Sequence, residues 1–152
     1  MENKNIIELV KKIRVETGLG IMEIKSAVEE AGGDEVKAKQ ILKEKGFKKA
    51  ESKTERETRQ GRVATYTHST GKIGVMIELQ CETDFVAKHE DFLELTKDLC
   101  LQITAMNPET VEDLLKQEFI KDSTQTIEEM IKTLVAKFGE NMKLTRFARF
   151  EI

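Results

Sequence analysis

Apolar residues recur every three or four positions through three segments near the N-terminus, and this spacing predicts three helices. The first segment ends at Gly18-Leu19-Gly20 and the second at Gly32-Gly33, where glycines favour turns. The third follows Asp34, a residue type that favours the helix N-cap, and we expect it to end before Gly46. We therefore predict a compact three-helix bundle over residues 1–46, close to the lower size limit for independent folding.

The apolar pattern then stops. Residues 47–60 are almost all charged or polar and carry no stripe wide enough to pack against another element. We predict a solvated linker, helical or extended, between the bundle and a second unit over residues 61–152.

The second unit begins with strand patterns. Residues 62–68 are rich in Val, Thr and Tyr, Ser69-Thr70-Gly71 supplies turn residues, and every second position from 73 to 81 is apolar. These features predict a β-hairpin. One face of its second strand is fully apolar and needs helices over it, whereas the other face is mixed.

Helical spacing follows the hairpin. One apolar stripe ends at Asn107-Pro108, and we expect Pro108 to open a short second helix. Thr126 and Glu129 form the pattern of a capping box, which predicts a third helix that ends at Gly139. The stripe of the first of these helices comprises Phe92, Leu95, Leu99, Ile103 and Met106.

Alternation returns at the C-terminal end, where residues 143–152 predict a third strand. We expect Leu144, Ala148, Phe150 and Ile152 to share one face, with Phe147 on the other. The order β-β-α-α-α-β predicts an α+β fold in which helices cover a three-stranded antiparallel sheet.

Composition and charge narrow the classes of function. The chain has 152 residues, 39% of them hydrophobic and 35% charged, which excludes a large multidomain enzyme and a disordered chain. No apolar run approaches the roughly 20 residues of a membrane span, and no secretory signal is visible, so we expect a cytoplasmic protein without membrane association. The first 62 residues carry 15 basic against 12 acidic side chains, and the remainder 10 against 16. This balance gives no case for direct nucleic-acid binding.

Candidates for catalysis are weak. Cys81 ends the apolar stripe of its strand and Cys100 lies on a helix next to Leu99 and Leu101, which favours reduced core thiols over a nucleophile paired with His68 or His89. No phosphate-binding loop, dinucleotide fingerprint or metal-ligand spacing is present. We expect no catalytic residue, no cofactor and no bound metal.

One segment is unusual, where the second strand becomes a loop at residues 81–88. Thr83 or Asp84 caps a turn of helix in one interpretation, with Phe85 and Val86 tucked beneath the next helix as a hydrophobic staple. In the other interpretation the loop presents a large aromatic beside an acid, which is the makeup of an interface hot spot.

Three blocks of the chain resemble the elongation factor Ts family, whose members exchange guanine nucleotide on elongation factor Tu. They occur in the family's order and span nearly the whole chain. The blocks are Ile13-Arg14-x-x-Thr17-Gly18-x-Gly20-x-Met22-x-x-Lys25-x-Ala27, Cys81-Glu82-Thr83-Asp84-Phe85-Val86-Ala87-Lys88 and Phe138-Gly139-Glu140-Asn141.

The resemblance implies roles for the first two blocks. The bundle is expected to be of the ubiquitin-associated type and to dock on elongation factor Tu, GDP-bound or nucleotide-free. Its implied contacts are Arg14, Ile21 and Met22, and Met22 lies outside the apolar arc of its own helix.

By the same resemblance, residues 83–86 form the exchange element. Phe85 is expected to enter a pocket of elongation factor Tu, and Asp84 to disturb the network that holds its Mg²⁺; Thr83 and Val86 belong to the same element. His68 is implied as a secondary contact, the alternative being an exposed turn residue.

Size is the main departure from the family. Longer members of the family contain two related halves of the core, whereas this chain has one. It also lacks the long helical insertion expected between Leu115 and Phe119. Short members of the family pair two chains, so we expect a homodimer whose seam holds Tyr66, Met76 and Phe147, the alternative being that these residues are covered within one chain. A competing hypothesis is a ubiquitin-associated-type binding adaptor without exchange activity.

Overall fold

Three helices form at the N-terminal end because each buries an apolar stripe against the other two. A computed structural model of the chain describes residues 2–152 and places α1 at Glu2–Thr17, α2 at Ile21–Glu30 and α3 at Glu35–Glu51. The Asp34 side chain accepts a hydrogen bond from the backbone N–H of Lys37 and caps α3, as predicted. The buried members of this first core are Val10, Ile13, Ile24, Ala27, Val28, Ala38 and Leu42.

The end of α3 differs from the prediction. The helix does not stop before Gly46 but continues to Glu51, so the first part of the expected linker is helical. Gly46 faces α7 (Ile127–Phe138), and a Cβ at this position would lie 3.1 Å from the Cβ of Ala136. Packing against α7 therefore keeps a glycine inside the helix, where local propensity favours an end.

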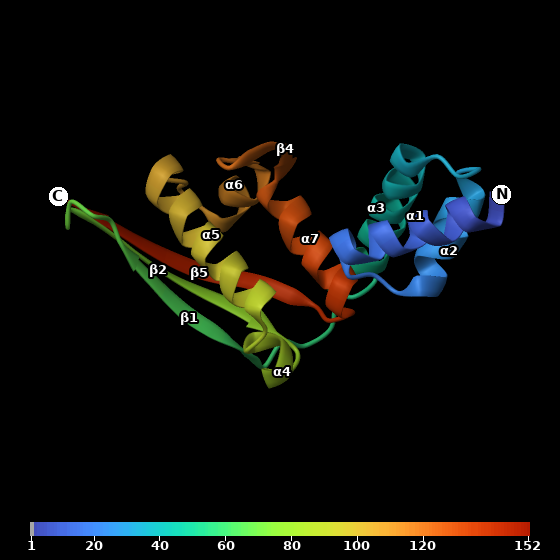
Figure 1. Ribbon diagram of the computed structural model, residues 1–152. Helices are drawn as coiled ribbons and strands as arrows, with labels where there is room; N and C mark the ends of the chain where they lie inside the picture. Colours follow the sequence, from blue (N-terminus) through green and yellow to red (C-terminus); the bar gives the residue numbers. More distant parts are fainter. Residues whose placement is uncertain (1) are drawn as a thin grey trace.

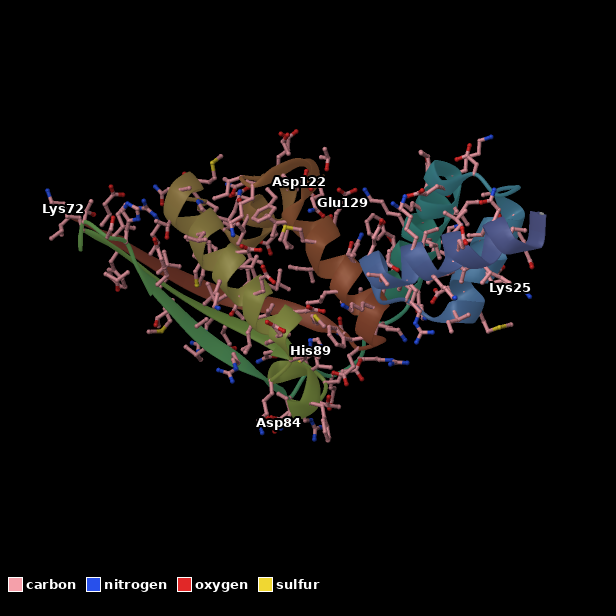
Figure 2. The ribbon with its side chains drawn as sticks, viewed as in Figure 1. Lys25, Lys72, Asp84, His89, Asp122 and Glu129 are labelled. Carbon is pink, nitrogen blue, oxygen red and sulfur yellow. The ribbon has the colours of Figure 1, made fainter. Side chains whose placement is uncertain are left out.

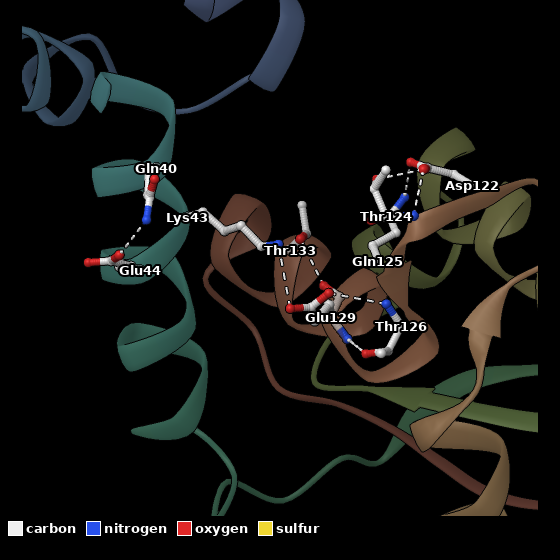
Figure 3. A network of polar contacts seen from close by, with 9 residues as sticks. All are labelled: Gln40, Lys43, Glu44, Asp122, Thr124, Gln125, Thr126, Glu129 and Thr133. Atoms are coloured by element: carbon white, nitrogen blue, oxygen red, sulfur yellow. Dashed lines mark hydrogen bonds and ion pairs between the residues drawn. The ribbon is translucent and has the colours of Figure 1, made fainter. Parts of the chain in front are cut away.

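α3 joins the bundle to the second unit (Figure 1). Ala50 near its end is buried in the core of the second unit, whereas Leu42 belongs to the first core. Across this contact Lys43 lies 3.5 Å from the carboxylate of Glu129, which also closes the capping box of α7 with Thr126 (Figure 3). Packing as well as chain connectivity thus links the two cores, while the division at residues 46 and 60 stays a prediction.

The second unit is built on a three-stranded antiparallel sheet in the order β1-β2-β5. Its strands are β1 (Gln60–Thr67), β2 (Ile73–Cys81) and β5 (Met142–Glu151). α5 (Glu90–Met106), α6 (Val111–Lys116) and α7 lie on one face of the sheet and leave the other uncovered (Figure 1). This confirms the predicted α+β architecture. The sheet and helices share a core that includes Val75, Ile77, Leu79, Cys81, Phe92, Leu95, Leu99, Ile103, Leu114, Ile127, Ile131 and Val135.

A β-bulge changes the expected faces of β5. Leu79 pairs with Leu144 but Glu78 pairs with Arg146, so Thr145 is an extra residue in the ladder. The extra residue reverses the alternation of the side chains beyond it. Leu144 therefore faces the core, and so does Phe147 opposite Ile77.

Two of the three residues expected in the seam lie on the covered face instead. The bulge places Phe147 on the core side, and Tyr66 faces the core because it pairs with Val75, so neither can form a seam between two chains. Met76 remains, with Val63 on one side and Ala148 and Phe150 on the other. The strict two-residue period could not reveal the position of Phe147, because a bulge leaves no mark in the apolar pattern, whereas Tyr66 follows the regular alternation of β1 opposite β2.

The helix boundaries bring two smaller corrections. Pro108 does not open α6, which begins at Val111 with Thr110 as its N-cap, and Met106 at the end of α5 is exposed. Two short strands, β3 (Glu118–Phe119) and β4 (Asp122–Thr126), form a hairpin between α6 and α7. A four-residue helix, α4 (Asp84–Ala87), joins β2 to α5. Within residues 2–152, none of the helices has the length and apolarity needed to cross a bilayer.

Candidate functional site

The segment after β2 forms one turn of helix that projects an aromatic ring from the molecule. We call residues 83–87 the Phe85 turn. Val86 and Ala87 are buried in the core, whereas Phe85 is 90% exposed. The staple interpretation is therefore right for Val86 and wrong for Phe85. Anchoring on one side of a helical turn fixes the direction in which the opposite side chain points.

Polar contacts complete the turn. Thr83 is the N-cap, with its hydroxyl oxygen 3.5 Å from the backbone N–H of Val86, and Arg62 donates from Nε to the carbonyl of Ala87 at 3.1 Å. Asp84 is exposed and forms an ion pair with Lys88 one turn later. An acid thus lies beside the exposed ring, as one interpretation of the sequence expected.

A corner between α7 and β5 supports this turn from behind. The Glu140 carboxylate accepts from both the backbone N–H and the hydroxyl of Thr83, at 3.0 and 2.6 Å. The backbone N–H of Asn141 donates to Glu82 at 2.7 Å. The sequence alone assigned no role to Glu140 and Asn141, because these contacts join positions nearly 60 residues apart. Their presence in the third block that resembles the family was the one signal that pointed to them.

The predicted docking residues of the bundle lie on a second surface. Arg14, Ile21 and Met22 are exposed, Met22 to 76%. An apolar groove of about 280 Å³ runs between α1 and α2 beside them. Its lining residues are Ile6, Ile7, Val10, Lys11, Arg14, Ile21 and Lys25, so its walls are apolar and its rim is basic.

His68 lies on a third surface, at the hairpin turn. Its Nδ1 atom is 3.3 Å from the hydroxyl of Tyr66, and the ring is half-buried. The nine-residue strand β2 separates it from the Phe85 turn, a span of about 30 Å. Figure 2 shows this separation, with Lys72 at the hairpin end, Asp84 at the α4 end and Lys25 on the bundle. The structure therefore does not bring the predicted partner-binding residues into one site.

The two thiols are core residues. Cys81 and Cys100 are buried and free. Burial raises the pKa of Cys81 to about 11, with a further contribution from the negative charge of Glu140. Burial likewise raises the pKa of Cys100 to about 11. His89 caps α5 through the backbone N–H of Asp91 instead of activating a thiol.

The thiols are therefore expected to react slowly. A thiol with a pKa of about 11 holds roughly a hundredfold less thiolate at pH 8 than one with a pKa of 9.0, and only the thiolate attacks a disulfide reagent. In a colorimetric thiol assay at pH 8, the native chain should react about 100-fold more slowly than the chain in urea. Equal rates in the two states would contradict the buried placement.

Comparisons with known proteins point to one family. A sequence profile described as elongation factor TS matches residues 82–152. A protein of Oleidesulfovibrio alaskensis named elongation factor Ts is 36% identical, over 95% of this chain and 96% of its own length. The elongation factors Ts of Coprothermobacter proteolyticus and Leptospira biflexa are 39% and 37% identical with the same coverage. These alignments run over 189 or 190 positions, more than the 152 residues here, so each relative carries residues without a counterpart in this chain.

Proposed function

The chain belongs to the elongation factor Ts family, and from that premise we propose that it promotes translation elongation by releasing GDP from elongation factor Tu. The observation that carries the proposal is the Phe85 turn. An aromatic side chain that is 90% exposed on an anchored turn is available to enter a partner's pocket without any rearrangement of this chain.

The proposed mechanism acts on the Mg²⁺ of the partner. Phe85 enters a pocket near the ion, and Asp84 disturbs the polar groups that hold it. Mg²⁺ in nucleotide sites is held by few protein oxygens, several waters and the phosphates, so a small displacement of these groups weakens both ion and nucleotide. The chain forms no covalent bond with the nucleotide in this scheme and is an exchange factor without a catalytic residue of its own.

Linkage sets the thermodynamic form of the mechanism. If binding of this chain weakens GDP binding by some factor, GDP must weaken the binding of this chain by the same factor. The nucleotide-free partner is therefore the state that binds the chain most tightly, and incoming nucleotide displaces it.

The bundle supplies a separate docking surface in this proposal. Arg14, Ile21 and Met22 contact the nucleotide-binding domain of the partner, and the neighbouring groove is apolar with a basic rim. An apolar ridge flanked by acids would complement it. His68, about 30 Å from Phe85, is a secondary contact with a more distant part of the partner.

The Mg²⁺ step predicts a specific dependence on chelator. Release of a fluorescent GDP from elongation factor Tu should accelerate strongly when the chain is added in the presence of Mg²⁺. With EDTA the ion is already gone, so the chain should add little to the spontaneous rate. Stopped-flow fluorescence measures both. Equal fold-acceleration with and without EDTA would contradict the ion step, and binding without any acceleration would leave only a docking adaptor.

We also propose that two chains pair through the uncovered face of the sheet. Val63, Met76 and Phe150 on this face are exposed, Met76 to 51% and Phe150 to 77%, and they lie beside Ala148. A second copy presents the same apolar residues, with the Glu78–Arg146 ion pair beside them, and covers them in a sandwich-like contact.

Light scattering at micromolar concentration tests the pairing. The expected mass is twice the 17.3 kDa of one chain. Phe150→Asp should reduce it to a single chain, because a carboxylate in the apolar seam would lose its hydration without a partner. Val36→Asp, an exposed apolar position on α3, is the matched control and should leave the mass unchanged. A parent mass near 17.3 kDa would refute the dimer.

A further inference from the structure

We propose that Glu140 is the positioning residue of the Phe85 turn: its carboxylate holds Thr83 so that Phe85 is presented in a single orientation. This inference rests on the proposed exchange function. It assigns a role to a residue outside the turn itself, 55 positions further along the chain than Phe85.

Both carboxylate oxygens of Glu140 accept hydrogen bonds from the same residue, Thr83. Oε2 of Glu140 accepts from the backbone N–H of Thr83 at 3.0 Å, and Oε1 accepts from its hydroxyl at 2.6 Å. Hydrogen bonds to an ionised acceptor are stronger than neutral ones, and two on one residue fix its orientation as well as its position.

The turn needs this support because it is too short to be stable alone. α4 has four residues, and its backbone bonds from Ala87 to Thr83 and from Lys88 to Asp84 are both 3.2 Å long. A single helical turn orders several residues for very few hydrogen bonds. The Thr83 cap is itself long, at 3.5 Å to the N–H of Val86. By donating its proton to Glu140, the Thr83 hydroxyl keeps a lone pair free for that cap.

Glu140 is in turn held by its neighbours. Gly139 ends α7 in the left-handed conformation, with φ +71°. The side-chain amide of buried Asn141 donates to the carbonyls of Thr54 and Arg56, at 3.2 and 2.8 Å, and its backbone N–H donates to Glu82. The Glu140 carboxylate therefore projects from a corner that is hydrogen-bonded to the segment between α3 and β1. Through its two bonds to Thr83 it extends this rigid support to the Phe85 turn.

Hydrogen exchange on the protein alone tests the contact without the partner. In Glu140→Ala the amide of Thr83 loses its acceptor, and the hydrogen-bonded amides of Thr83 and of residues 86–88 should exchange at least about tenfold faster. Glu140→Gln should stay close to the parent, because its amide oxygen can accept from the N–H while its NH₂ group donates to the hydroxyl. Glu109→Ala removes an exposed glutamate on the loop between α5 and α6 and is the matched control.

Amides of β2 and α5 report whether the effect is local. They should exchange as in the parent in all three variants. Unchanged protection at Thr83 in Glu140→Ala, or equal loss across the sheet, would overturn a positioning role. Should Glu140→Ala fail to fold, Thr83→Val removes the hydroxyl that donates to Glu140 and caps Val86, and it should also speed exchange of the amides of residues 86–88. Parent-like exchange in Thr83→Val would then overturn the proposal.

Nucleotide release adds the functional readout. With increasing chain concentration, Glu140→Ala should lower the maximal acceleration of GDP release about tenfold, while the half-saturating concentration changes less than about twofold because the bundle still docks. Glu140→Gln and Glu109→Ala should match the parent. An unchanged maximum in Glu140→Ala overturns the positioning role. Failure of the parent itself to accelerate release defeats the exchange function instead, and the hydrogen-exchange result then decides whether Glu140 orders the turn.

Discussion

Replacing Phe85 with alanine is expected to slow the accelerated release of GDP from elongation factor Tu by about 100-fold. Truncation of an aromatic hot spot costs roughly 2–4 kcal/mol of interaction energy, and each 1.4 kcal/mol is a factor of ten. The loss should appear in the rate because, in the proposed mechanism, Phe85 acts when the nucleotide site opens. Stopped-flow release of a fluorescent GDP, with chain in excess, measures it.

The fold should not change in this variant. Phe85 is 90% exposed, so its removal takes almost no contact from the core, and the thermal midpoint should match the parent. Met106→Ala is the matched control, since Met106 is an exposed apolar residue at the opposite end of α5 from the turn. A Phe85→Ala chain that releases GDP as fast as the parent would remove the exchange role from this residue.

Replacing Gln102 with leucine is expected to lower the free energy of unfolding by about 3 kcal/mol. Gln102 is fully buried on α5 and holds the β3-β4 hairpin through three hydrogen bonds. Its amide NH₂ group donates to the side-chain oxygen of Gln117 and to the carbonyl of Glu118, and its oxygen accepts from the N–H of Ile120. Leucine has a similar volume but leaves these groups unpaired, at a cost of about 1–3 kcal/mol for each buried one.

Urea unfolding followed by circular dichroism measures this loss. Gln40→Leu is the matched control, because Gln40 is an exposed glutamine on α3 whose side chain donates to Glu44 one turn later, and it should change stability by less than about 0.5 kcal/mol. A Gln102→Leu midpoint within error of the Gln40→Leu midpoint would show that the hairpin contributes nothing to global stability.

Periodicity predicted the elements that have one apolar face. The stripe of β2 is buried as expected, and the capping box of Thr126 with Glu129 and the stop at Gly139 are confirmed. It failed where a distant element decides the local structure. α3 continues through Gly46 because α7 packs there, and β5 changes its faces at Thr145 because of a bulge.

The candidate site divides in the same way. A large aromatic beside Asp84 in a loop between a strand and a helix was visible in the sequence, and the exposure of Phe85 agrees with the hot-spot interpretation. The support from Glu140 and Asn141 was not visible in the sequence, because it depends on hydrogen bonds between segments far apart in the chain. The roles of Arg14, Met22 and His68 stay predictions, placed now on separate surfaces.

The continuous helix α3 fixes the spacing between the two cores. Leu42 lies in one core and Ala50 in the other, and eight helical residues at about 1.5 Å each set their separation along the axis at about 12 Å. The two cores cannot slide apart without breaking backbone hydrogen bonds or withdrawing Ala50 from its packing. Any partner that contacts both the bundle and the Phe85 turn must therefore fit this fixed spacing. A conformational change needed for such binding takes place in the partner.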